Sequence, residues 1–114
     1  EHFGIRTNTQ TVQGSFCDGR YNLAAAGRKI AGTAQHWQRD QSAANRYRVL
    51  SHAVILAADP AMLTERANRF EQALGSATHY RADKTTSLLE LAGAGGAASL
   101  AALQTIIKTH HTIH

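Results

Sequence analysis

The sequence has one cysteine, one proline and only 6% aromatic residues among its 114 residues. A single cysteine excludes an internal disulfide framework and a cysteine-rich zinc site. So few aromatic side chains argue against a platform that stacks the bases of single-stranded nucleic acid. No apolar run approaches the roughly 18 residues of a membrane span, and no basic segment followed by an apolar one indicates a signal peptide. We therefore expect a cytoplasmic protein that does not bind a membrane.

The remaining composition is that of one folded unit, residues 1–114. Hydrophobic residues make up 43% and charged residues 18% of the chain, which is typical of a globular domain. The net charge is +4 and the pI is about 9.7. Because the basic residues are scattered rather than clustered, nucleic acid is an improbable partner, and the charge suits an acidic protein or a phosphate-bearing ligand equally well. No zinc, calcium or P-loop motif is present, so we expect no metal site.

The first two thirds of the chain contain the patterns of an antiparallel hairpin and a central strand. Residues 21–26 and 29–37 predict two strands joined by a turn at Gly27-Arg28, in which Ile30, Gly32, Ala34 and His36 share one face. A polar loop over 38–46 precedes the most hydrophobic stretch, 47–58, which predicts a central strand. Residues 1–15 predict a short strand or a loop.

The last third contains helical patterns. Asp59-Pro60 predicts a helix start with a carboxylate cap, and Gly75 predicts its end. Leu63, Ala67, Phe70 and Leu74 form its apolar stripe. Residues 87–91 predict a short helical turn or strand, 92–98 a flexible linker, and about 99–110 a last helix capped by Ser99. The fold class is α+β, with helices that can cover one face of a mixed or antiparallel sheet.

Three side chains are candidates for chemistry. Cys17 lies between the turn-forming pairs Gly14-Ser15 and Asp18-Gly19, which favours exposure and so allows a nucleophilic thiolate, although a lone cysteine is more often a buried, inert thiol. Lys29 follows a turn and precedes small residues, so it is either a solvated hairpin lysine or a cation that holds a carbonyl, carboxylate or phosphate oxygen. His52, within the hydrophobic strand, is more typical of a core histidine than of a catalyst.

Two segments then resemble a known family. The run from Gly14 to Leu23 (GSFCDGRYNL), followed by GRKIAGTAQ from Gly27 to Gln35, is similar to the lysine-bearing hairpin of biotin/lipoate protein ligases and octanoyltransferases. Its first part resembles the cysteine-dependent octanoyl or lipoyl amidotransferases. Asn22 stands where the family usually has aspartate. Leu50–Leu56 resembles the family's H-H-G-T-L-L strand, with changes at its first histidine and its glycine, and Thr86–Leu88 matches its T-S-L motif. The resemblance covers residues 14–91.

The resemblance implies an acyltransferase of lipoate metabolism, with a partial ligase-like catalytic fold. It implies that Cys17 takes an octanoyl or lipoyl group as a thioester, while Lys29 holds the acyl carbonyl. It implies substrate contacts from Gly32, Thr33, Ala34 and His52. The acceptor would be a lipoyl domain or the H-type protein of glycine cleavage, which a basic chain suits. The acyl group is then a substrate, and no covalently bound cofactor is expected.

Two alternatives remain open at this point. The first is an ATP-dependent lipoate-protein ligase in which Cys17 is incidental, so that ATP would be a second substrate. The second is a non-catalytic module that binds lipoyl domains or another subunit. The residue that would activate Cys17 is also open, with His36 and His52 candidates by residue type alone.

The length conflicts with the resemblance. The family's catalytic domain is much longer, and its R-R-x-x-G-G loop, which lines the acyl pocket, has no counterpart here. The chain therefore resembles the C-terminal portion of such a domain. Either the chain is a truncated domain, or a second polypeptide or a second copy supplies the missing half. We expect an incomplete core and an exposed apolar sheet edge or face. The isolated chain should be dimeric or inactive.

Overall fold

The computed structural model describes residues 4–93 and 100–110, and in them a four-stranded antiparallel sheet of order β1-β2-β3-β4. Its strands are β1 (Asn8–Gln10), β2 (Asn22–Ala25), β3 (Arg28–Arg39) and β4 (Tyr47–Ile55). Together with the helices they confirm the α+β class. The strand expected over 47–58 ends at Ile55, and the first fifteen residues contain one short strand.

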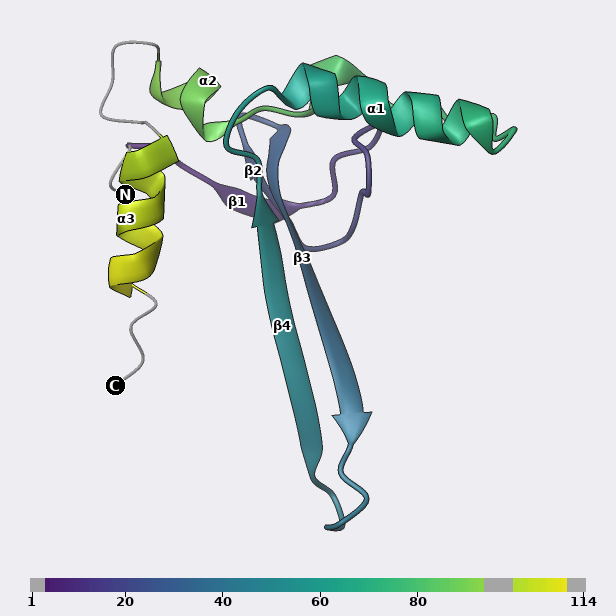
Figure 1. Cartoon of the computed structure of the whole chain (residues 1–114), viewed down its shortest axis with the longest axis vertical. Helices are drawn as coiled ribbons and strands as arrows, with labels where there is room; N and C mark the ends of the chain where they lie inside the picture. Colours follow the sequence, from purple (N-terminus) through teal and green to yellow (C-terminus); the bar gives the residue numbers. More distant parts are fainter. Residues whose placement is uncertain (1–3, 94–99, 111–114) are drawn as a thin grey trace.

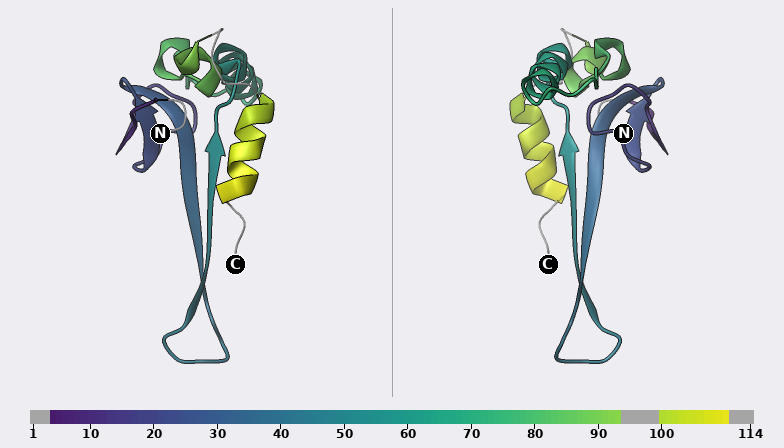
Figure 2. Two further views of the ribbon diagram at one scale, coloured as in Figure 1. Left: turned by 90° about the vertical axis from the view of Figure 1, so that its left-hand side faces the viewer. Right: turned by 90° about the vertical axis from the view of Figure 1, so that its right-hand side faces the viewer.

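The helices gather at one end of this sheet (Figure 1). They are α1 (Pro60–Ala73), the 3-10 turn η1 (Ala82–Lys84), α2 (Leu88–Ala92) and α3 (Leu100–His110). β1 and β2 lie on one side of the long hairpin and α3 lies on the other (Figure 2). The segment expected as a helical turn or strand is helical, because the Ser87 hydroxyl accepts a hydrogen bond from the Glu90 N–H, 3.2 Å away. Ser99 and most of the expected linker lie outside the described residues.

The helix start at α1 differs from the expected one. Asp59 has φ 49° and ψ 51°, and its side chain makes no capping hydrogen bond. A left-handed backbone replaces the extended conformation in which a carboxylate can cap. The C-terminal end agrees with expectation, since Gly75 has φ 70° and follows the C-cap residue. The apolar stripe is only partly covered, with Phe70 63% exposed.

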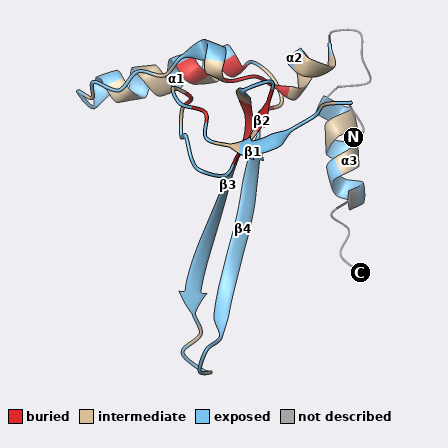
Figure 3. Ribbon diagram, turned by 180° about the vertical axis from the view of Figure 1, so that it is seen from behind, coloured by how far each residue is buried: buried red, intermediate tan, exposed pale blue. Residues whose placement is uncertain are grey.

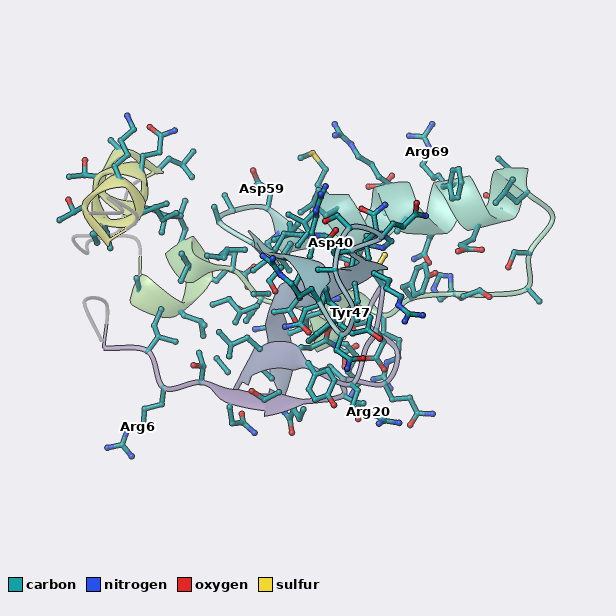
Figure 4. The ribbon with its side chains drawn as sticks, turned by 90° about the horizontal axis from the view of Figure 1, so that it is seen from below. Arg6, Arg20, Asp40, Tyr47, Asp59 and Arg69 are labelled. Carbon is teal, nitrogen blue, oxygen red and sulfur yellow. The ribbon has the colours of Figure 1, made fainter. Side chains whose placement is uncertain are left out.

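The core lies where β2 and the start of β3 meet the helical end, and the rest of the hairpin is exposed (Figure 3). Every residue of β4 is exposed, and β4 is an edge of the described sheet, so its prediction as a central strand is wrong. Its exposed apolar side chains include Leu50 and Val54, at 62% and 63%. Figure 4 looks along the hairpin from below, with Asp40 and Tyr47, at the ends of the loop that joins β3 and β4, near the middle of the view. The expected exposure of an apolar sheet edge is confirmed.

A β-bulge changes the expected faces of β3. Leu23 pairs with Ala31, whereas the next residue of β2, Ala24, pairs with Lys29. β3 therefore carries one extra residue, Ile30, opposite β2. Ile30 and Ala31 consequently line the same apolar cavity, and Ile30 does not share a face with Gly32 as simple alternation predicts. The bulge instead turns Lys29 toward the face of Gly32, where their atoms are close.

The turn between β2 and β3 consists of Ala26 and Gly27, with φ 48° and 75°. Both residues are left-handed, as a two-residue hairpin turn that matches strand twist requires. Arg28 belongs to β3, so the turn lies one residue earlier than the sequence pattern predicts.

Ala26 is therefore a position at which glycine should stabilise the fold. We expect Ala26→Gly to raise the free energy of unfolding by about 0.5–1 kcal/mol, because relief of left-handed strain exceeds the added entropy of the unfolded chain. Ala25→Gly is the matched control and should lower it by about 1 kcal/mol, since Ala25 is a buried strand residue. Urea unfolding measures both changes. An equal loss of stability in the two variants would contradict the described turn.

Candidate functional site

The loop that carries Cys17 is closed by hydrogen bonds near both of its ends. The N–H and hydroxyl of Ser15 donate to the Val12 carbonyl at 3.0 and 2.8 Å. The Val12 N–H donates to Asp18 Oδ1 at 2.8 Å. Within this loop Cys17 is exposed, as the flanking turn residues predict, and it has φ 47°. A left-handed backbone at a residue other than glycine persists only where its surroundings hold it.

Asn22 anchors the loop to the sheet. It is the first residue of β2 and only 2% exposed. Its amide donates to Asp18 Oδ1 at 2.6 Å. Buried amides need such partners, because an unsatisfied polar group costs about 1–3 kcal/mol. The departure from the family's aspartate is therefore accommodated, since an amide can donate to Asp18 whereas a carboxylate cannot.

Lys29 holds the loop from the other side. Its side chain is buried, with 3% of the residue exposed, so it is not the solvated hairpin lysine that the sequence left open. Its ammonium donates to the Phe16 carbonyl at 2.9 Å and to the Cys17 carbonyl at 2.6 Å. Nζ also lies 5.5 Å from the centre of the Phe16 ring, within the range of a cation–π interaction.

The electrostatics of Lys29 reflect this position. Burial lowers the pKa of Lys29 below its usual 10.5, while negative charge at Cys17 and Asp18 acts in the opposite direction. Desolvation is the largest cause, because removing an ammonium from water favours its neutral form. Cys17 and Asp18 are thus the charged groups that favour the ammonium form.

The missing side chain of Gly32 leaves a gap about the size of one methyl group next to this ammonium. A Cβ at Gly32 would lie 3.5 Å from both Cε and Nζ of Lys29. An ammonium has three N–H donors, and the bonds to the loop carbonyls use two of them. The space beside Gly32 can therefore admit a ligand oxygen close to Nζ.

The Thr85-Thr86-Ser87 segment supports Lys29 through its backbone. The Thr86 N–H donates to the Lys29 carbonyl at 2.9 Å, and Thr85 forms an isolated parallel β-bridge with Lys29. All three residues of the segment are buried, each with 0% of its surface exposed. Arg81 N–H donates to the Gly14 carbonyl at 2.8 Å. This part of the chain therefore fixes both Lys29 and the Cys17 loop.

The other residues implied by the resemblance lie further along the hairpin. Ala34 pairs with His52, five residues beyond Lys29, which is about 16 Å along a strand. Both line an open groove of about 1060 Å³ together with Thr33. Thr33 also donates to the Tyr21 carbonyl at 2.9 Å. His52 is exposed on β4, so the interpretation as a core histidine is wrong. The structure thus brings together Cys17, Lys29 and Gly32, and separately Thr33, Ala34 and His52.

A smaller apolar cavity lies under α3. Its volume is about 290 Å³, and its lining is almost wholly aliphatic. The side chains come from the N-terminal segment, the sheet, α2 and α3: Ile5, Thr7, Leu23, Ile30, Ala31, Ile55, Leu88, Leu103, Ile106 and Ile107. Ile55 and Ile107 also line the groove, so the two hollows adjoin.

The described residues 4–93 and 100–110 lack two features, a cluster of metal-binding side chains and a helix that could span a membrane. They contain no group of three or more histidine, cysteine, aspartate or glutamate side chains placed to hold a metal ion. None of the helices in this part of the chain has the length and apolarity needed to cross a bilayer.

Comparison with known proteins finds relatives of this chain. The chain is 40% identical over 98 residues, 82% of its length, to an octanoyl-[GcvH]:protein N-octanoyltransferase of Kyrpidia tusciae. This similarity supports a distant relation of the chain to the octanoyltransferase family. The chain is also 48% identical over 108 residues, 86% of its length, to an uncharacterized protein of Cupriavidus necator. The chain spans only 34% and 43% of these two relatives. No model of a protein family matches it.

Sequence reasoning missed two contributors to the site. Asp18 was treated only as a turn residue, although its position next to Cys17 and four residues before Asn22 was visible. The role of Thr85 and Thr86 as a backbone support could not be read from the sequence, because their contact with Lys29 joins segments more than fifty residues apart.

The lowered pKa of Lys29 predicts a pH-dependent stability. Between that pKa and 10.5 the unfolded chain binds the proton more tightly than the folded chain, so the free energy of unfolding should rise with pH there. The cost of burying the ammonium is fully present below this window and absent above it. Urea unfolding at pH values from neutral to above 10.5 should show this rise in the wild type and lose it in Lys29→Met.

Lys84→Met is the matched control, because Lys84 is a half-buried lysine outside the hydrogen bonds to the loop carbonyls. It should keep the rise. The same pH dependence in Lys29→Met and the wild type would contradict the described burial of Lys29.

Proposed function

We propose that this chain carries the nucleophile and the cationic residue of an acyl transfer, in which an octanoyl or lipoyl group passes through a thioester on Cys17. One observation carries the proposal: the buried Lys29 ammonium donates to the carbonyl of Cys17 itself, 2.6 Å away. An exposed thiol is thereby held beside a fixed cation. The similarity to a protein named as an octanoyltransferase supports this assignment.

The chemistry consists of two substitutions at one carbonyl carbon. In the first, the Cys17 thiolate forms an S–C bond and the donor's C–N bond breaks, while the nitrogen takes one proton from water and leaves as the free lysine amine of the donor. In the second, a lysine amine of the acceptor forms a new C–N bond and the S–C bond breaks. The acceptor nitrogen loses a proton, and the thiolate is restored.

Lys29 acts on the oxygen of the same carbonyl. Negative charge develops on this oxygen as either nucleophile attacks, and a cation that is already oriented stabilises it. The remaining N–H of Lys29 and the space beside Gly32 provide the place for that oxygen. The acyl chain then extends along β3 toward Thr33 and Ala34, with His52 across the hairpin.

The donor is a protein with an acylated lysine, and the acceptor is a protein with a free lysine. The relative's name specifies octanoyl-GcvH as its donor and a protein as its acceptor. A basic chain of pI about 9.7 suits an acidic acceptor such as a lipoyl domain or an H-type protein. Because the chain spans less than half of either relative, we further propose that additional polypeptide, from a second protein or a second copy, completes the acyl pocket.

Acyl capture tests the proposal. The protein, in the assembly that completes its acyl pocket, is incubated with octanoyl-GcvH, and its intact mass is measured before and after treatment with hydroxylamine. We expect one octanoyl group that hydroxylamine removes, because thioesters are labile to it and amides are not. Cys17 is the only cysteine, so a labile group identifies its site. Cys17→Ser should show no capture, and Lys29→Met should show at least a hundredfold slower capture.

Lys84→Met and a reaction with ATP and free octanoate are the controls. The lysine control should capture at the wild-type rate. Octanoylation of the acceptor that requires ATP and proceeds in Cys17→Ser would replace the proposal with a ligase. Unmodified Cys17 together with acceptor binding that survives Lys29→Ala would replace it with a non-catalytic binding module.

A further inference from the structure

Asp18 accepts two of the hydrogen bonds that hold the Cys17 loop, one from Val12 and one from Asn22. We propose that Asp18 is a positioning residue for Cys17, and that Asn22 is the amide partner that this carboxylate requires. The catalytic part of this proposal rests on the proposed acyl transfer, because the position of Cys17 affects the rate only if Cys17 takes the acyl group. Its structural part concerns the conformation of Cys17 and stands on the contacts of the loop.

A single oxygen atom makes the connection. Asp18 Oδ1 accepts from the Val12 N–H at 2.8 Å and from the Asn22 amide at 2.6 Å. Val12 is 4% exposed and Asn22 is 2% exposed, so both donors are fixed in the core while Asp18 itself is on the surface. Hydrogen bonds to a charged acceptor are stronger than those between neutral groups.

This clamp acts directly on Cys17, which is the residue before Asp18. Lys29 holds the Cys17 carbonyl on one side, and Asp18 is held by Asn22 on the other. The backbone of Cys17, at φ 47°, is thereby fixed between two anchored neighbours. A left-handed cysteine needs such anchoring because its Cβ disfavours the conformation.

The clamp also explains the residue at position 22. The family pattern has aspartate there, whereas this chain has its carboxylate at Asp18 and an amide at Asn22. An aspartate at both positions would bring two carboxylates to the 2.6 Å separation now held by a hydrogen bond. Neither carboxylate could donate, and their charges would repel. The acidic member and the amide member of the pair are thus interdependent.

Exchange of the two side chains tests this interdependence. The variants are Asn22→Asp, Asp18→Asn, the double variant that combines them, and Asp18→Ala. Asp40→Asn is the matched control, because Asp40 lies in the loop at the hairpin tip. The readouts are the rate of Cys17 alkylation by iodoacetamide, the rate constant and KM of octanoyl capture, and the thermal midpoint. Rates are measured at a temperature at which every variant is folded.

We expect Asn22→Asp and Asp18→Ala to change the alkylation rate of Cys17 and to slow octanoyl capture by about tenfold, with little change in KM for the donor, because a released loop holds Cys17 in the attack geometry less often. Asp18→Asn should be mild, because its amide oxygen can still accept both hydrogen bonds. The double variant should recover to within about threefold of the wild type, since the amide and the carboxylate have only changed places. Asp40→Asn should match the wild type.

Two results would overturn the proposal. One is a double variant as slow as Asn22→Asp, which would show that the two residues act independently. The other is a lowered thermal midpoint with unchanged Cys17 rates in the folded protein, which would make the clamp a stabilising feature only. If the wild type captures no octanoyl group, the proposed function fails, whereas iodoacetamide still reports on the clamp.

Discussion

The buried ammonium of Lys29 is the interaction on which the site depends. It extends from the sheet to the loop and donates to the carbonyls of Phe16 and Cys17. A residue of β3 therefore orients the loop that carries Cys17. Burying a cation is unfavourable unless its donors find acceptors, and the loop carbonyls supply them. The loop in turn owes its left-handed Cys17 to this cation and to the Asp18 clamp. The sheet, the Lys29 cation and the Cys17 loop therefore form one unit.

The sheet delivers Lys29 to this position through its local irregularities. A tight turn at Ala26-Gly27 sets the register of β2 and β3. The bulge at Ile30 then directs Lys29 toward the side of Gly32 while Ile30 contributes to the apolar cavity. Without the extra residue, Lys29 and Gly32 would point to opposite faces. The far part of the hairpin takes no part in this arrangement and leaves β4 exposed.

Much of this fold was predictable from the sequence, and the exceptions have physical causes. The strands, α1 and the exposed Cys17 follow from periodicity and turn residues, which act locally. The bulge was not predictable, because small and apolar residues at 30–34 are compatible with simple alternation. Burial of Lys29 was not predictable either, since its acceptors are backbone carbonyls that carry no sequence signal. Asp59-Pro60 marked the right helix start, but the left-handed Asp59 backbone prevented the expected cap.

Hydrogen exchange at the amides of Val12 and Ser15 tests the central claim most directly. Both N–H groups bond within the Cys17 loop, whereas the Leu56 N–H bonds to the Ile30 carbonyl in the sheet. If the Lys29 ammonium holds the loop, Lys29→Met will speed exchange at Val12 and Ser15 well beyond any change at Leu56, and Lys84→Met will change none of the three. Equal protection of the loop amides in Lys29→Met and in the wild type would contradict the account.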